Sequence, residues 1–176
     1  MTHTFLVSTL FVATLPAFAA VSEPGGLSPR LRASAAEEPA FLLTASGVQV
    51  YECRGAPGTP GGYMWKFTNP DATLSDGSGS VARNVTATVY EATGDRSSIT
   101  ATVLASQPAG SDNLPWTAMR AQALAEEGLF AGVTSVQRVN THGGVAPRDG
   151  CGESTVGSEA RVDFTADYYF YRRRAG

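Results

Sequence analysis

Apolar and polar residues alternate one by one along several stretches of this chain, and this pattern constrains the fold more than any other feature of the sequence. The clearest stretch is 161–171, where the expected inward-facing residues are Val162, Phe164, Ala166, Tyr168 and Phe170. Successive side chains of a β-strand point to opposite faces, so this alternation predicts a strand with one buried face and one solvent-exposed face. Such strands are typical of antiparallel sheets.

Further strands are predicted over residues 47–53, 63–67, 81–91, 98–104 and 133–140. Within the stretch 81–91, the residues expected to share the buried face are Val81, Val85, Ala87 and Val89. Turn sequences rich in Asn, Pro, Asp and Gly separate the early strands, as expected for short antiparallel connections.

One stretch has helical spacing instead. Pro115 suits the first position of a helix and Gly128 suits its C-terminal cap. The apolar residues between them fall on one helical face: Trp116, Met119, Ala123 and Leu124. We therefore expect one mostly β domain over residues 41–174, an antiparallel barrel or sandwich of about six strands with one helix.

The beginning of the chain has the pattern of a secretory signal peptide. An apolar run over residues 5–15 is followed by the small-x-small sequence Ala17-Phe18-Ala19. We expect residues 1–19 to be a cleaved signal, residues 20–40 to be a flexible leader, and the protein to be exported to the periplasm or the extracellular space. No later apolar run is long enough for a transmembrane helix, which needs roughly 20 residues.

The chain has two cysteines, Cys53 and Cys151. A lone pair of cysteines in an oxidising compartment usually forms one bridge, and neither residue lies in the Cys-x-x-Cys spacing of a redox site. The sequence therefore predicts a structural disulfide.

Charge and motif content exclude several function classes. The net charge is −3, and the one compact basic cluster is the terminal Arg172-Arg173-Arg174, so a nucleic-acid partner is not expected. Residues 77–82 match the Gly-x-Gly-x-x-Ala form of the dinucleotide fingerprint, but a strand is predicted where that motif needs a helix. No cofactor is predicted, and the oligomeric state is left open.

The catalytic candidates are His142, Asp163 and Asp167, with the histidine and one carboxylate acting as base and acid. The two aspartates share a strand face but should lie about 13 Å apart, at roughly 3.3 Å per residue. That separation exceeds the roughly 5–9.5 Å of a glycosidase pair. The alternative is that all three are solvated surface residues. No metal site is predicted, because His142 would need carboxylates as its companion ligands, which is unusual for zinc.

The ligand-binding candidates are the outward tyrosines Tyr169 and Tyr171, which suit a glycan or an apolar molecule, and the backbone N–H groups of Gly143 and Gly144, which suit an anion. The alternative for the tyrosines is packing at the edge of the sheet, and the alternative for the glycines is a glycine-rich turn without a ligand. Our leading hypothesis is a non-catalytic exported protein that binds a small molecule or a surface glycan. The rival hypotheses are a small enzyme that uses His142, and an envelope-associated structural protein without a ligand.

Several segments, taken together, resemble a domain-of-unknown-function family of exported bacterial and fungal proteins. The segments that carry the resemblance are 47–53, Trp65-Lys66-Phe67, 114–116, 136–141, Gly143-Gly144, Ala146-Pro147, Cys151 and 166–171. The resemblance implies export and a paired cysteine, and it implies no established activity. The family usually carries a histidine in its middle strand, whereas this chain has Asn84 and Tyr90 in that region, which implies a lost or altered function if that histidine is functional.

Overall fold

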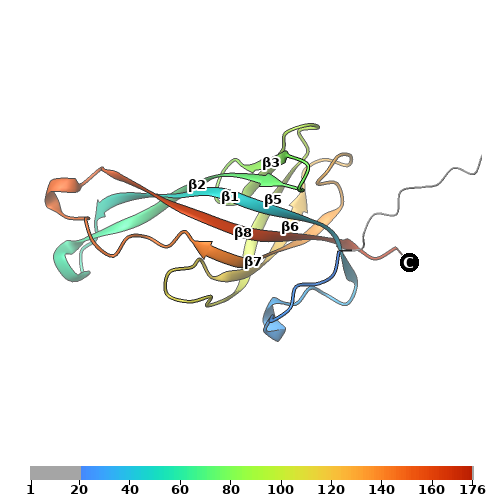
Figure 1. Ribbon diagram of the computed structural model, residues 1–176, viewed down its shortest axis with the longest axis horizontal. Coiled ribbons are helices and arrows are strands. Elements are labelled where there is room, and N and C mark those ends of the chain that lie inside the picture. The colour runs from blue at the N-terminus through green and yellow to red at the C-terminus, as the bar shows by residue number, and fades with distance from the viewer. Residues whose placement is uncertain (1–20, 176) are drawn as a thin grey trace, which may run out of the picture.

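The protein is an antiparallel β-barrel. A computed structural model describes residues 21–175 (Figure 1). Its strands are β1 (Glu37–Gly55), β2 (Tyr63–Ser75), β3 (Ser80–Asn84), β4 (Val89–Ala92), β5 (Ser98–Gln107), β6 (Trp116–Ala123), β7 (Val133–Gly143) and β8 (Glu159–Arg173). Each strand pairs with the next, and β8 pairs with β1 to close the barrel. The predicted antiparallel, mostly β class is confirmed, with eight strands in place of about six.

The predicted helix over residues 115–127 is wrong. Residues Trp116–Ala123 form β6, which pairs with both β5 and β7. Thr117, Met119 and Ala121 are buried there, while Arg120 between them and Gln122 after them are exposed. Alanines fit either periodicity, and pairing with two neighbouring strands overrides the helix propensity of this stretch. The helices of residues 21–175 are three short 3-10 turns, Pro29–Leu31, Pro60–Gly62 and Glu153–Thr155, and none of them could cross a membrane.

The single strand predicted over 81–91 is two strands, because residues 85–88 form a tight turn between β3 and β4. The Val85 N–H donates to the Val89 carbonyl oxygen at 2.9 Å and closes this turn. The predicted buried face is also wrong. Val85 is 42 % exposed, whereas the buried residues of the two strands are Ala82, Asn84, Tyr90 and Ala92.

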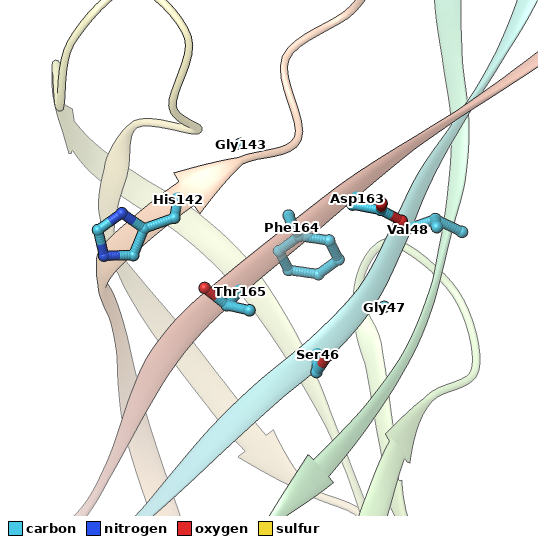
Figure 2. A pocket seen from close by; sticks show the side chains of 8 residues that line it. All are labelled: Ser46, Gly47, Val48, His142, Gly143, Asp163, Phe164 and Thr165. Carbon is cyan, nitrogen blue, oxygen red and sulfur yellow. The ribbon is translucent and has the colours of Figure 1, made fainter.

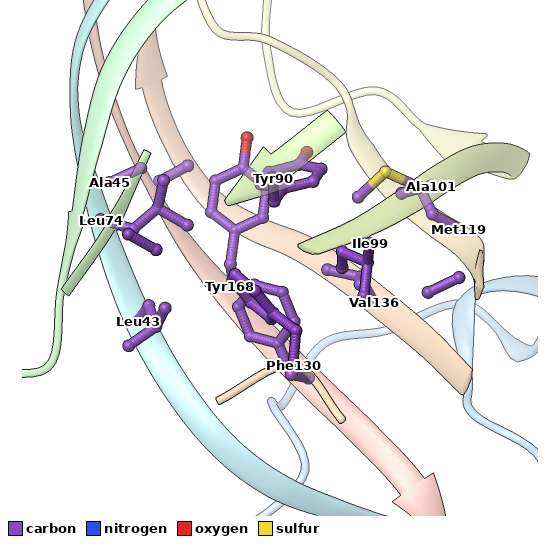
Figure 3. Packing of buried hydrophobic residues seen from close by; sticks show 14 of the residues in the cluster. Leu43, Ala45, Leu74, Tyr90, Ile99, Ala101, Met119, Phe130, Val136 and Tyr168 are labelled. Atoms are coloured by element: carbon purple, nitrogen blue, oxygen red, sulfur yellow. The ribbon is translucent and has the colours of Figure 1, made fainter. Parts of the chain in front are cut away.

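Apolar side chains fill most of the barrel interior (Figure 3). Phe170 of β8 packs against Phe130, with ring centroids 5.3 Å apart, and Phe130 comes from the loop between β6 and β7. The N–H of Phe130 donates to the Ser97 hydroxyl oxygen, and the N–H of Leu129 donates to the Asp95 carboxylate. These bonds hold the loop so that Phe130 enters the core with no exposed surface.

The longest strands continue past the barrel as an arm, formed by the β1–β2 hairpin and by the chain leading into β8 (Figure 1). Gly47 lies where β1 crosses close to β2, and a Cβ there would lie 2.2 Å from the Asp71 carbonyl oxygen. Farther along the arm, Cys53 and Cys151 form a disulfide with their Cα atoms 5.3 Å apart, which confirms the predicted bridge. Backbone hydrogen bonds between Cys53 and residues 157 and 158 surround it.

Residues 21–36 lie against the outer face of the barrel, and we call this segment the strap. Leu31 of the strap has no exposed surface, and Leu27 and Leu31 pack with Val139 and the partly buried Trp116 and Tyr169. These contacts do not agree with the flexible leader predicted over residues 20–40. The predicted signal, residues 1–19, lies outside the described residues and stays a prediction.

Candidate functional site

A cavity of about 330 Å³ lies at the end of the barrel from which the arm projects. Inward-facing residues of nearly every strand line it, together with residues of the β3–β4 turn and of the segment before β6. The lining residues are Gln49, Tyr51, Phe67, Pro70, Asn84, Ala87, Thr88, Tyr90, Val103, Leu114, Arg138 and Tyr168. We call this space the barrel cavity; its volume falls at the small end of the range of small-molecule sites.

The floor of the barrel cavity is polar, in contrast to the apolar core beneath it. Asn84 of β3 and Arg138 of β7 line the cavity, and Thr117, which is opposite Arg138 in the sheet register, is buried beside them. Within the described residues, Asn84 Oδ1, Thr117 Oγ1 and Arg138 Nε are buried without a hydrogen-bond partner. Nearly all buried polar groups in proteins are paired, so unpaired ones that cluster in one place need an explanation.

Two tyrosines stand between the apolar core and this floor. The rings of Tyr90 and Tyr168 meet edge to face with centroids 5.6 Å apart, and both residues are almost completely buried. Figure 3 shows their hydroxyl oxygens on the same side of the apolar cluster, pointing away from Phe130. Burial raises the pKa of Tyr90 well above its ordinary value, and the neighbouring Tyr168 raises it further. Tyr90 is therefore a neutral phenol at physiological pH.

Among residues 21–175, Arg138 is the one charged residue that lines the barrel cavity. One guanidinium nitrogen, Nη2, donates to the Pro115 carbonyl oxygen at 3.0 Å, which holds the side chain in place. Arg138 takes part in none of the ion pairs found among residues 21–175. The cavity floor consequently carries a positive charge without a protein counter-charge.

Apolar groups surround the entrance of the barrel cavity. Val103 is 56 % exposed and Phe67 is 44 % exposed, and both line the cavity. The ring of Tyr51 meets that of Phe67 with centroids 5.8 Å apart, and its hydroxyl donates to the Gly144 carbonyl oxygen. The entrance is thus apolar and the floor is cationic, an arrangement that suits an amphipathic small molecule.

Two of the three catalytic candidates lie at a different place. His142 and Asp163 line a hollow of about 430 Å³ on the outer surface, bounded by β1, β7 and β8 (Figure 2). The two side chains lie on opposite sides of Phe164 in Figure 2, with the imidazole turned away from the carboxylate. Within residues 21–175, no hydrogen bond or ion pair joins His142 to Asp163, although a working acid–base pair needs hydrogen-bond reach to a common substrate.

Asp167 is not part of that hollow. Its carboxylate accepts hydrogen bonds from Thr44 Oγ1 at 3.2 Å and from Asn140 Nδ2 at 2.8 Å. Both partners lie on neighbouring strands, so Asp167 ties β1, β7 and β8 together on the outer face. No group of three or more His, Cys, Asp or Glu side chains that could hold a metal ion occurs in the part of the chain that the structure describes.

The tyrosines predicted as exposed ligand contacts are covered by the strap. Tyr171 is only 1 % exposed, and its hydroxyl donates to Gln137 Oε1 at 2.6 Å. Tyr169 is half-buried against Leu27, Leu31 and Val139. The expectation that both point into solvent is wrong for Tyr171, because a second layer of chain covers this face.

The two glycines predicted to bind an anion make close backbone contacts. Gly143 donates its N–H to Asn113 Oδ1 at 2.8 Å, so this donor already has a partner. A Cβ at Gly143 would lie 2.4 Å from the Asp163 carbonyl oxygen, and a Cβ at Gly144 would lie 2.8 Å from Leu114. Both residues have positive φ, which favours glycine. Their ligand role stays a prediction.

No residue of the barrel cavity is among the candidate binding or catalytic residues predicted from the sequence. Arg138 belongs to a stretch predicted as a weak strand, and its position two residues after the inward-facing Val136 was the available signal. Asn84 was predicted to face outward because the turn inside 81–91 was not recognised. Which inward polar residues share one end of a barrel depends on the register between strands that are distant in sequence.

Fold and cavity together define a class: a small closed antiparallel barrel, cross-linked by one disulfide, with an apolar core and a cationic cavity at one end. A family model described as "Protein of unknown function (DUF3455)" matches residues 34–93 and 80–172. The chain therefore belongs to the DUF3455 family, and the resemblance stated from its sequence segments is confirmed at the level of the family. Comparison with curated proteins and with solved structures gave no significant match.

Proposed function

We propose that this protein is an exported binding protein that holds a small molecule in the barrel cavity. The observation that carries the proposal is that two residues on the cavity floor have buried polar atoms without partners among the described residues, Asn84 Oδ1 and Arg138 Nε. Thr117, the register partner of Arg138, has a third such atom next to the cavity. A barrel of this size can fill its interior with side chains, as this one does around Phe170, so an open polar end is not a requirement of the fold.

The unpaired polar groups on the cavity floor lower the stability of the protein when no ligand is bound. Each buried polar group without a partner destabilises a protein by about 1–3 kcal/mol, and a charged group costs more. A bound molecule that supplies hydrogen-bond partners would remove this cost. Aromatic and apolar groups at the entrance, among them Phe67 and Val103, would contact the remainder of the same molecule.

Two features support export. The N-terminal apolar run with Ala17-Phe18-Ala19 has the form of a cleaved signal. A structural disulfide such as Cys53–Cys151 persists in oxidising compartments. N-terminal sequencing of the protein from an exported fraction should begin at Ala20, and an intact Met1 would contradict this part of the proposal.

Native mass spectrometry of the protein purified from its exported fraction tests the binding function. We expect added mass that leaves on denaturation. Ala87→Trp should reduce it, because Ala87 lies at the edge of the barrel cavity on an exposed turn. Val85→Trp is the matched control, since Val85 belongs to the same turn but does not line the cavity. A clean apo mass together with no A87W-sensitive binding in a fragment panel would favour the structural alternative without a ligand.

A further inference from the structure

We infer that the molecule bound in the barrel cavity is a monocarboxylate, with its carboxylate at Arg138 and an apolar or aromatic body toward the entrance. This inference rests on the proposed binding function and specifies the chemical class of the ligand.

The first support is the position of the guanidinium. Arg138 points into the barrel from β7, and its register partners are Thr117 on β6 and Tyr168 on β8. Its Nη2 is held by the Pro115 carbonyl oxygen, while its Nε–H is buried and has no acceptor among the described residues. A donor fixed in this way suits a carboxylate, because charged hydrogen bonds of this kind are about twice as strong as neutral ones.

The second support is the missing counter-charge. None of the residues that line the barrel cavity is an aspartate or a glutamate. Asp167 is near in the sheet register, opposite Val139, but it lies on the outer face and accepts from Thr44 and Asn140. Arg138 is half-buried and its Nε is fully buried, so the guanidinium is incompletely hydrated and the site favours a ligand that carries the opposite charge.

The third support is the character of the other polar groups. Tyr90 and Tyr168 line the cavity with phenol hydroxyls, which can donate hydrogen bonds to an oxygen. The cavity is lined by one cationic side chain, that of Arg138. Aromatic groups, including Phe67 and Tyr51, lie at its entrance. One guanidinium balances a single negative charge, and the aromatic groups add apolar contact, so a carboxylate with a hydrophobic body fits better than a phosphate.

The test compares two probes of nearly identical shape, benzoate and benzamide, by isothermal titration calorimetry on the full chain freed of endogenous ligand. We expect benzoate to bind about tenfold or more tightly than benzamide, the ratio that one charged hydrogen bond supplies. Arg138→Met should abolish the preference, and Arg138→Lys should retain part of it. Arg120→Met is the matched control, because Arg120 lies on the adjacent strand β6, is exposed and does not line the barrel cavity.

Folding of the variant is checked independently. Arg138→Met keeps most of the apolar part of a half-buried side chain and removes a charge that has no ion-pair partner among the described residues, so its urea midpoint without ligand should stay close to that of the wild type. Unfolding of R138M would instead assign Arg138 a structural role and overturn the inference.

The outcomes separate the two proposals. If benzoate and benzamide bind with equal affinity, and Ala87→Trp weakens the binding of both, the carboxylate inference is overturned while the proposed binding function stands. Absence of binding by both probes would also overturn the carboxylate inference, and the native mass measurement would then decide the binding function by itself.

Discussion

The hydroxyl of Tyr171 donates a hydrogen bond of 2.6 Å to Oε1 of Gln137 on the outer side of the barrel. The amide nitrogen of Gln137 in turn donates to the Leu31 carbonyl oxygen, also at 2.6 Å. Both side chains are almost fully buried, so a chain of polar contacts joins β8, β7 and the strap beneath a second apolar layer. The outer face of β7 and β8 is therefore part of the interior at this position.

Tyr171→Phe should destabilise the protein by about 1–3 kcal/mol, because it leaves a buried amide oxygen without its donor. Chemical denaturation with urea measures the change. Tyr169→Phe is the control, since Tyr169 is half-buried and the described residues offer its hydroxyl no hydrogen-bond partner. Equal stabilities for wild type and Y171F would show that the bond contributes little.

Leu31→Ala tests whether the strap is part of the folded domain. Leu31 has no exposed surface, and removal of a buried leucine side chain costs about 2–5 kcal/mol. The same change at Leu124, which is 57 % exposed, should alter the free energy of unfolding by less than about 0.5 kcal/mol. A loss at Leu31 no larger than that at Leu124 would indicate that the strap leaves the barrel in solution.

Replacement of both cysteines by serine should lower the free energy of unfolding by about 3–5 kcal/mol. The two residues are separated by 98 positions, and a disulfide restricts the unfolded chain more when the loop it closes is long. Unfolding of the wild type with and without dithiothreitol gives an independent measure. The double serine variant should not respond to the reductant, and a response there would mean that the reductant acts elsewhere.

Asp95 should make the stability of the protein depend on pH in the acid range. Hydrogen bonds from the side chain and backbone of Ser97 and from the backbone of Leu129 lower the pKa of Asp95 below its ordinary value. A lowered pKa in the folded state means that the stabilisation is present above the unfolded pKa and is lost as pH falls through the folded pKa.

Asp95→Asn should therefore lower the urea midpoint near about pH 7, and its difference from the wild type should shrink towards about pH 3. Glu126→Gln, on an exposed residue of the β6–β7 connection that Asp95 contacts through Leu129, should follow the wild type throughout. A D95N deficit that stays constant over this range would contradict an effect of ionisation.

Much of the fold could be predicted from alternation alone. The stretch 161–171 places Phe164, Ala166, Tyr168 and Phe170 inside as expected, because a strand with one buried face needs no knowledge of its neighbours. The predictions failed where local patterns were ambiguous. Alanines let β6 be taken for a helix, and the turn at 85–88 was hidden inside an apparently continuous strand.

The candidate site was much harder to predict. His142 and Asp163 do line one hollow, but no contact joins them there, and Tyr171 is covered by a segment that was expected to be flexible. Arg138, Asn84 and Tyr90 come from three strands and attracted no catalytic or binding prediction. Asn84 and Tyr90 stood out only as departures from the family pattern, and Arg138 only as part of a predicted strand.

By itself, the sequence determined the antiparallel β class and the disulfide, because alternation and a lone cysteine pair are properties of local pattern and of composition. Only the tertiary structure decided that the sheet closes, that the strap covers Tyr171, and that Arg138 meets Tyr168 and Asn84 in one cavity. The reason is physical: barrel closure sets the register between strands far apart in the chain, and that register decides which inward side chains share a layer.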